Sequence, residues 1–155
     1  MVTNLKNACH AGSCMCGSVQ FETVGLPFDV AYCHCESCRR HNAAPAVILA
    51  GFRAEQVSFS GSERKFFNSS PGVYRAFCPK CGTPLTWEGI FGKMGQVIEI
   101  HTGAFEKPEA FVPTGHAFEP ERIDWFDTVD NLPRFEGFTQ ETTVIRRKPV
   151  KNALE

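Results

Sequence analysis

Seven of the eight cysteines fall into three short clusters, and this grouping constrains the fold more than any other feature of the chain. Cysteines one or two residues apart rarely bridge each other without strain, whereas a short loop can aim two sulfurs at a metal about 2.3 Å away. A disulfide scaffold would fit the even number of cysteines, but not the reducing cytoplasm that we expect. Bound metal is therefore favoured over disulfides. The clusters are Cys14 with Cys16; Cys33, Cys35 and Cys38; and Cys78 with Cys81, while Cys9 stands alone.

Two of the clusters have the form of zinc knuckles. Between Cys78 and Cys81 a proline stiffens the turn, and the following Gly82 permits a left-handed backbone that points amides at the sulfurs. Cys14 and Cys16 form a shorter loop, also followed by glycine. An iron–sulfur cluster takes thiolates too, but the spacing is closer to that of zinc ribbons. Together the two knuckles supply four thiolates, which would close a tetrahedral zinc site.

Cys33, Cys35 and Cys38 remain as a second group of sulfurs close together in the sequence. Three protein ligands and one open position are the pattern of catalytic zinc. The second cluster therefore predicts a zinc site with a free coordination position. The alternative is a closed structural site, with its fourth ligand from His34, His41 or Cys9.

The rest of the chain is expected to be mostly β. Residues 18–24 alternate, with Val19, Phe21 and Thr23 on one face. A Ser-Ser-Pro-Gly turn joins two segments that predict a hairpin, and only a short helix is expected. The 10 prolines and 13 glycines divide the chain into short pieces, as in strand-rich sheets. The hairpin segments are Lys65–Asn68 and Val73–Phe77, the helix is Glu36–His41, and further extended segments are Phe28–Tyr32, Ala46–Leu49, Val57–Phe59, Pro84–Trp87 and Val97–Thr102.

Length and composition predict one domain over residues 1–138, followed by a polar, basic and solvated tail over residues 139–155. The formal net charge of −1 argues against nucleic-acid binding. No apolar run approaches the ~18–20 residues of a membrane span. The first residues lack the apolar centre of a secretory signal. We therefore expect a soluble cytoplasmic protein.

The order of these motifs resembles the glutathione-dependent formaldehyde-activating (GFA) family, whose relatives include centromere-protein-V-type zinc domains. The similarity spans roughly residues 12–135; its cysteine pattern is highly specific, while its late segment is weak alone. The resemblance implies a zinc-ribbon-like, Mss4-like β-sheet assembly with short helical turns. It also implies two zinc ions per chain, a structural one on Cys14, Cys16, Cys78 and Cys81 and a catalytic one on Cys33, Cys35 and Cys38. The motifs lie at Gly12–Phe21, Cys33–Arg39, Phe77–Thr83 and Gly115–Phe118, with Trp125.

The resemblance implies an enzyme that joins glutathione to formaldehyde as S-(hydroxymethyl)glutathione, and whose reverse reaction is that of a carbon–sulfur lyase. Three thiolates give zinc a net negative charge, which weakens it as a Lewis acid toward water. Such a site still favours a soft sulfur ligand, and a substrate thiol bound there would deprotonate. The alternative function is a zinc-stabilised binding module without catalysis, because fold alone does not fix function.

Several polar and aromatic residues are weaker candidates. Alternation should turn His34 away from the metal, toward a supporting or surface role, although a proton shuttle is an alternative. Arg39, Arg40 and His41 would offset the thiolate charge or grip a substrate carboxylate, unless they are simply solvated. The others are His101 as a sheet histidine, Trp87 and Trp125 as core or rim aromatics, Cys9 as a free thiol, and His116, for which no role follows from the sequence.

Overall fold

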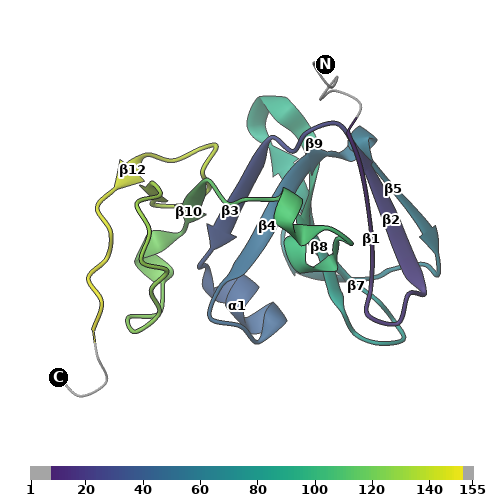
Figure 1. The fold of residues 1–155 in the computed structure, drawn as a ribbon, viewed down its shortest axis with the longest axis horizontal. Coiled ribbons are helices and arrows are strands. Elements are labelled where there is room, and N and C mark those ends of the chain that lie inside the picture. The colour runs from purple at the N-terminus through teal and green to yellow at the C-terminus, as the bar shows by residue number, and fades with distance from the viewer. Residues whose placement is uncertain (1–7, 152–155) are drawn as a thin grey trace. The chain divides into compact units, whose positions relative to one another are not determined.

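The computed structural model describes residues 8–151 and divides them into two compact units. The first unit comprises the described residues of Met1–Phe28 together with Ala50–Phe111, and the second comprises those of Asp29–Leu49 and Val112–Glu155. Strands are the main regular elements of both units, with one α-helix and several short 3₁₀ turns among the described residues (Figure 1). The prediction of a mostly β fold with short helical turns is confirmed. Residues 1–7, and residues 152–155 of the expected tail, lie outside the described part.

The first unit contains a three-stranded antiparallel sheet in the order β1-β2-β5, whose strands lie side by side in Figure 1. Its strands are β1 (Cys9–Ser13), β2 (Val19–Val24) and β5 (Val57–Gly61). Along β2, Val19, Phe21 and Thr23 are buried and the residues between them are exposed. Successive side chains of a strand point to opposite faces, so the alternating sequence lays one apolar row against the core. The predicted pattern of this strand is confirmed.

Four antiparallel strands of the first unit follow one another in the order β9-β8-β7-β6. Their bounds are β6 (Lys65–Ser70), β7 (Val73–Phe77), β8 (Pro84–Phe91) and β9 (Gly95–His101). The predicted hairpin is β6 and β7, and Gly72 adopts a φ of 74° in its turn. That left-handed conformation carries no steric cost for glycine. The 3₁₀ turns among the described residues of this unit are Ala54–Gln56, Gly92–Met94, Thr102–Ala104 and Pro108–Ala110.

Phenylalanine rings fill the core of the first unit. The rings of Phe105 and Phe111 have centroids 4.0 Å apart, and Phe21 meets Phe105 edge-on at 5.0 Å. Phe52 is fully buried and contacts the same group. Burying one such side chain contributes about 1.5–3 kcal/mol. Of the two tryptophans expected in the core or at its rim, Trp87 is buried, whereas Trp125 is 59% exposed.

The second unit joins short strands to the single helix. The strand order is β12-β11-β10-β3, and β10 runs parallel to β3 with His116 opposite Tyr32 and Ala117 opposite Cys33. Strands of two or three residues have no periodic signal, so β10, β11 and β12 escaped the sequence analysis. The elements are β3 (Asp29–Cys33), α1 (Glu36–Asn42), β10 (Gly115–Ala117), the 3₁₀ turn Glu119–Glu121, β11 (Arg134–Phe135) and β12 (Val144–Ile145), while β4 (Val47–Arg53) is divided between the units.

The segment that follows Phe138 is mostly exposed but makes specific contacts within the second unit. The Thr139 hydroxyl donates to the Asp29 carboxylate. Lys148 donates its backbone N–H to Glu119 at 2.9 Å and its ammonium to the Arg122 carbonyl at 2.8 Å. The expectation of a merely solvated tail misses these bonds, because their partners lie far away in the sequence.

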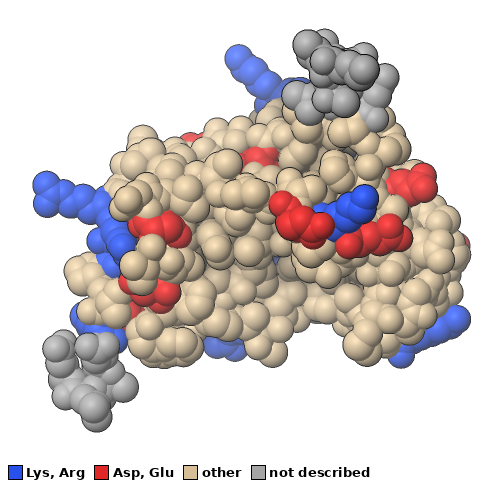
Figure 2. All heavy atoms as spheres, viewed as in Figure 1, with Lys and Arg blue, Asp and Glu red and all other residues tan. Residues whose placement is uncertain are grey.

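On the face shown in Figure 2, acidic and basic side chains are interspersed among uncharged residues. This mixture agrees with the formal net charge of −1. Among the residues described, no helix combines the length and the apolarity that a membrane span requires.

Candidate metal centres

The first metal centre lies on two loops of the first unit. The loop after β1 carries Cys14 and Cys16, and the loop between β7 and β8 carries Cys78 and Cys81. Each loop closes with a glycine N–H bonded to the carbonyl of its first cysteine at 2.9 Å, and each of these glycines has a φ above 70°. A side chain is strained in that conformation, so the glycine that follows each pair lets the loop curl around its sulfurs.

The four sulfurs of this centre all lie within 4.8 Å of one another. The Cys16 Sγ is 3.6 Å from that of Cys14 and 3.8 Å from that of Cys78. Four sulfurs at about 2.3 Å from a central zinc ion would be separated by about 3.8 Å in a regular tetrahedron. The geometry of the side chains therefore fits zinc, and the structure brings together all four predicted ligands.

Two hydroxyl groups support these sulfurs and were missed by the sequence analysis. The Ser18 Oγ lies 3.1 Å from the Cys16 Sγ and 3.3 Å from the Cys78 Sγ. The Thr83 Oγ1 lies 3.1 Å from the Cys81 Sγ and accepts the N–H of Met15, which links the two loops. Both residues stand within two positions of a cysteine, but serine and threonine are too common in turns to signal such a role.

Hydrogen bonds favour the thiolate form of two cysteines of the first centre, Cys81 and Cys14. Bonds from the hydroxyl and N–H of Thr83 lower the pKa of Cys81 to about 5. At Cys14, burial raises the pKa, but bonds from the Val19 N–H and neighbouring side chains outweigh it and lower the pKa to about 7. Since the thiolate is the metal-binding form of cysteine, these bonds prepare the site for a cation.

The second centre lies where β3 meets α1. Cys33 is the last residue of β3, Cys35 is the N-cap of α1, and Cys38 lies in its first turn. The Cys35 sulfur accepts the Cys38 N–H at 3.3 Å. A strand end followed by a helical turn thus folds three nearby cysteines toward one point, and their sulfurs lie within 4.8 Å of one another.

Apolar side chains enclose this second centre. Cys33 and Cys38 are buried in a cluster with Val47 and Leu49, against which Phe118 and the less buried Cys35 pack. Hydrogen bonds with Cys35 and Cys38, together with burial, raise the pKa of the Cys33 thiol well above its ordinary value. The Cys33 thiol therefore resists ionisation in this apolar site, so a cation bound there would have to displace its proton.

Within residues 8–151, no fourth cysteine, histidine or carboxylate joins this three-sulfur group. The alternative in which His34, His41 or Cys9 completes it is therefore not supported. Arg39 donates its Nε–H to the His34 carbonyl at 3.1 Å, while Arg40 forms an exposed ion pair with Glu36. The second group thus has three donors that suit zinc, as the spacing predicted.

His34 belongs with His116 and Glu119 to a group separate from the three sulfurs, and it is fully buried and so has no surface role. Its Nε2 lies 2.9 Å from the Nδ1 of His116, a residue to which the sequence assigned no role. Burial, followed by the nearby arginines, lowers the pKa of His34 to about 4, so the ring is neutral at physiological pH. Glu119 lies close to both rings and forms an ion pair with Arg122 at 3.0 Å.

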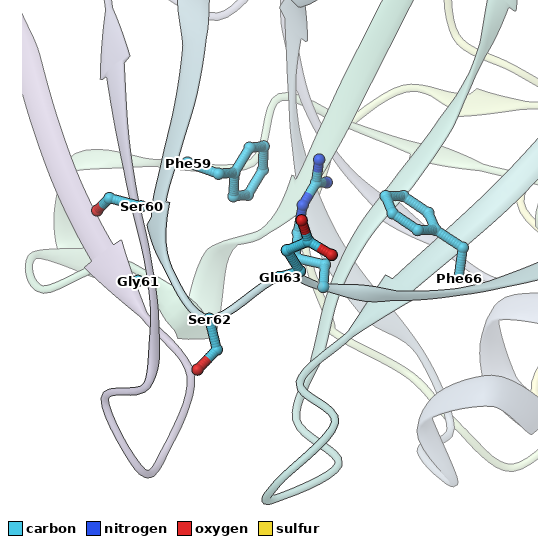
Figure 3. Close-up of a pocket in the computed structure, with 7 residues that line it drawn as sticks. Phe59, Ser60, Gly61, Ser62, Glu63 and Phe66 are labelled. Carbon is cyan, nitrogen blue, oxygen red and sulfur yellow. The ribbon is translucent and has the colours of Figure 1, made fainter.

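A separate surface hollow of about 270 Å³ lies in the first unit, between β5 and the start of β6 (Figure 3). The Arg64 guanidinium carbon stands 3.4 Å from the centroid of the Phe59 ring and 4.9 Å from that of Phe66. Arg64 is also ion-paired with Glu88. Its charge is therefore already balanced, and none of the residues that line the hollow belongs to a group of possible metal ligands.

Comparison with known proteins agrees with this arrangement. The profile of a family described as glutathione-dependent formaldehyde-activating enzyme matches residues 9–121, which is more than half of the chain. The chain belongs to the GFA family. The matched part of this GFA protein contains all seven clustered cysteines, His34 and His116, but it ends before Asp130.

Two relatives extend the comparison. An uncharacterised lyase of Schizosaccharomyces pombe is 29% identical over 84 residues, which cover 54% of this chain and 61% of that protein. The GFA protein thus spans less than two thirds of that relative's length. The crystal structure of a Rhodobacter sphaeroides protein is similar with a TM-score of 0.51 and 20% identity, over 62% of this chain and 87% of that chain. The structural likeness supports the fold alone.

Proposed function

We propose that this GFA protein is a zinc-dependent carbon–sulfur lyase that joins a thiol such as glutathione to formaldehyde and also cleaves the adduct. The observation that carries the proposal is the group of Cys33, Cys35 and Cys38, whose three sulfurs lie within 4.8 Å of one another. A three-sulfur site leaves one position for a fourth ligand, and thiolate surroundings favour a sulfur there. The family and the relative named as a lyase support the reaction class.

Each part of the second centre has a role in the proposed reaction. Cys33, Cys35 and Cys38 would hold zinc, which supplies the chemistry of lowering a bound thiol's pKa. Val47, Leu49 and Phe118 line the buried side of the centre and exclude water from it. Cys35 is less buried than its two partners, so we place the substrate's approach on its side.

The proposed reaction balances without any redox partner. The substrate thiol loses its proton, and the thiolate sulfur attacks the carbonyl carbon of formaldehyde to form a carbon–sulfur bond. The electron pair of the broken carbon–oxygen π bond moves to the oxygen, which takes up a proton. In the reverse direction the carbon–sulfur bond breaks and the thiolate leaves. Arg40 is 79% exposed near this centre and is our candidate for contacting a substrate carboxylate.

The first centre is proposed to have only a structural role. Its cysteines come from two loops that are distant in the sequence, and their four sulfurs would complete the coordination of zinc. We therefore propose two zinc ions per chain, with the substrate bound at the second.

The test measures metal content and thiol binding on the same protein. Under reducing conditions we expect two zinc equivalents for the wild type and one for Cys38→Ser. Titration of the cobalt-substituted protein with glutathione should change its thiolate-to-metal absorption, and Cys38→Ser should abolish this change. Exchange NMR should show faster interconversion of formaldehyde and its glutathione adduct with wild-type protein than without it.

One zinc equivalent in the wild type, unaltered by Cys38→Ser, would remove the second centre and with it the proposed activity. Two equivalents without any response to thiols or any faster exchange would favour the zinc-stabilised binding module.

A further inference from the structure

A buried chain of hydrogen bonds runs from the loop of the second centre to a carboxylate in a distant segment. The His34 Nε2 lies 2.9 Å from the His116 Nδ1, and the His116 Nε2 lies 3.1 Å from the Asp130 carboxylate. When both rings are neutral, the carboxylate can only accept, so His116 carries its hydrogen on Nε2. Its Nδ1 then accepts the Nε2–H of His34. One pattern of donors therefore satisfies both of these bonds, while the buried His34 Nδ1 has no hydrogen-bond partner among the described residues.

His34 is fixed at its backbone as well as at its ring. Its N–H donates to the Ala117 carbonyl at 3.1 Å, and its own carbonyl accepts from Arg39 at 3.1 Å. Because His34 is the residue between Cys33 and Cys35, these bonds restrict the backbone that aims both sulfurs. The ring of His34 is the third point of attachment, and it depends on His116.

His116 is held in turn from both sides. Its ring stacks on Tyr32 with centroids 4.5 Å apart and planes 9° apart. The Asp130 carboxylate that receives its Nε2–H also accepts from Arg134 at 2.9 Å, and Thr128 lies within 3.4 Å of the same nitrogen. The ion pair with Arg134 thus fixes the Asp130 side chain as well.

The backbone is strained at the place that brings Asp130 to His116. Val129 has a φ of 46°, a conformation that a β-branched residue rarely adopts, and its side chain is 82% exposed. The residues on either side of it, Thr128 and Asp130, both reach His116. Strain of this kind, about 1–3 kcal/mol, persists only where the surrounding contacts impose it.

The charged side chains around His34 and His116 indicate a hydrogen-bonded network rather than a further metal site. Glu119 and Asp130 face the two buried guanidinium groups of Arg122 and Arg134, so two negative charges meet two positive charges. A divalent cation here would be left without compensating charge. Three of the four ring nitrogens are already hydrogen-bonded, two to each other and one to Asp130, so only the His34 Nδ1 is left for a metal ion.

We infer that His116, anchored by Asp130, is a positioning residue for the second centre and acts through His34 on the sulfurs of Cys33 and Cys35. The inference rests on the proposed zinc site at that centre. Outer partners of metal-binding groups commonly change metal affinity by about 10–100-fold. The matched family region ends at residue 121, so the Asp130 anchor lies outside it.

The experiment compares His116→Phe with His116→Asn in the full chain. Phe keeps a ring to stack on Tyr32 but cannot accept the His34 hydrogen, whereas the Asn amide oxygen can stand near the lost Nδ1. We expect His116→Phe to bind zinc at the second centre at least about tenfold more weakly and to shift the cobalt–thiolate absorption of that centre. His116→Asn should recover most of the affinity. The first centre should be unchanged in both variants and is the internal control.

If His116→Phe does not fold, Asp130→Ala and Asp130→Asn provide the same comparison from a partly exposed position. Asn keeps an oxygen that accepts from His116 and Ala does not. Second-centre affinity and spectrum equal to those of the wild type in both His116→Phe and Asp130→Ala would overturn the positioning role. A wild-type protein that binds only one metal ion would instead overturn the proposed function, so the two failures are distinguishable.

Discussion

Replacing Glu119 by leucine should destabilise the protein strongly, because this buried carboxylate neutralises two arginines. Glu119 has no solvent exposure, and Arg122 and Arg134 are 2% and 4% exposed. One carboxylate oxygen accepts from the Arg122 Nε at 3.0 Å and from the backbone N–H of Lys148 at 2.9 Å. The other lies 3.5 Å from the Arg134 Nε. Leucine would leave the buried guanidinium charges of Arg122 and Arg134 without this carboxylate, and the backbone N–H of Lys148 without its acceptor.

The size of the effect follows from those contacts. Removing one partner of a buried ion pair costs about 3–5 kcal/mol. Leaving a buried N–H unsatisfied costs about 1–3 kcal/mol, but the two terms share one side chain and do not simply add. We expect the free energy of unfolding to fall by about 4 kcal/mol. For a chain of this length, each kcal/mol corresponds to about 2–4 °C in Tm, so Glu119→Leu should lower Tm by about 8–16 °C.

The assay is equilibrium unfolding in urea and by heat, with zinc present and under reducing conditions. Glu119→Gln keeps an oxygen acceptor of the same shape and should lose less stability than Glu119→Leu. Arg40→Ala is the matched control, because its ion pair with Glu36 joins side chains that are 79% and 58% exposed. Such a surface pair contributes about 0.3–0.5 kcal/mol. A Glu119→Leu variant within about 1 kcal/mol of the wild type would refute the buried charge network.

Three further changes test other parts of the structure. Cys81→Ser should prevent stable folding, because structural zinc contributes about 10–16 kcal/mol of apparent binding free energy in small zinc domains; circular dichroism should detect the loss, and Cys9→Ser should fold normally. Gly12→Ala should cost about 1–3 kcal/mol in urea unfolding, because its added methyl would meet an aromatic ring at 2.2 Å and a backbone oxygen at 2.4 Å. The matched control is Gly103→Ala, where the methyl has open space. Val129→Asn should raise stability by about 1 kcal/mol, because asparagine tolerates a positive φ and the valine is exposed.

Each of these predictions has a result that would contradict it. An unchanged melting temperature in Cys81→Ser would argue against a structural first centre. Equal stability of Gly12→Ala and Gly103→Ala would show that the backbone near Gly12 yields easily. A destabilised Val129→Asn would mean that the valine side chain makes a favourable contact despite its exposure.

The sequence by itself determined the features that depend on neighbours along the chain. The alternation of Val19, Phe21 and Thr23 predicted β2, and the turn before Gly72 predicted the hairpin of β6 and β7, because both signals are local. Cysteines two or three positions apart likewise predicted the second sulfur group and each of the two pairs in the first. A short loop leaves few ways to arrange such neighbouring cysteines, so their spacing largely determines how close their sulfurs lie.

Only the tertiary structure decided which distant groups support those sulfurs. The Thr83 hydroxyl accepts the N–H of Met15, which lies 68 positions earlier in the sequence. The rings of His34 and His116 are hydrogen-bonded although 82 positions separate them in the sequence. Strands as short as β10 have no periodic pattern; their hydrogen-bond partners in β3 and β11 define them. Contacts of this kind depend on how the whole chain buries its polar groups together, and local residue preferences do not encode that outcome.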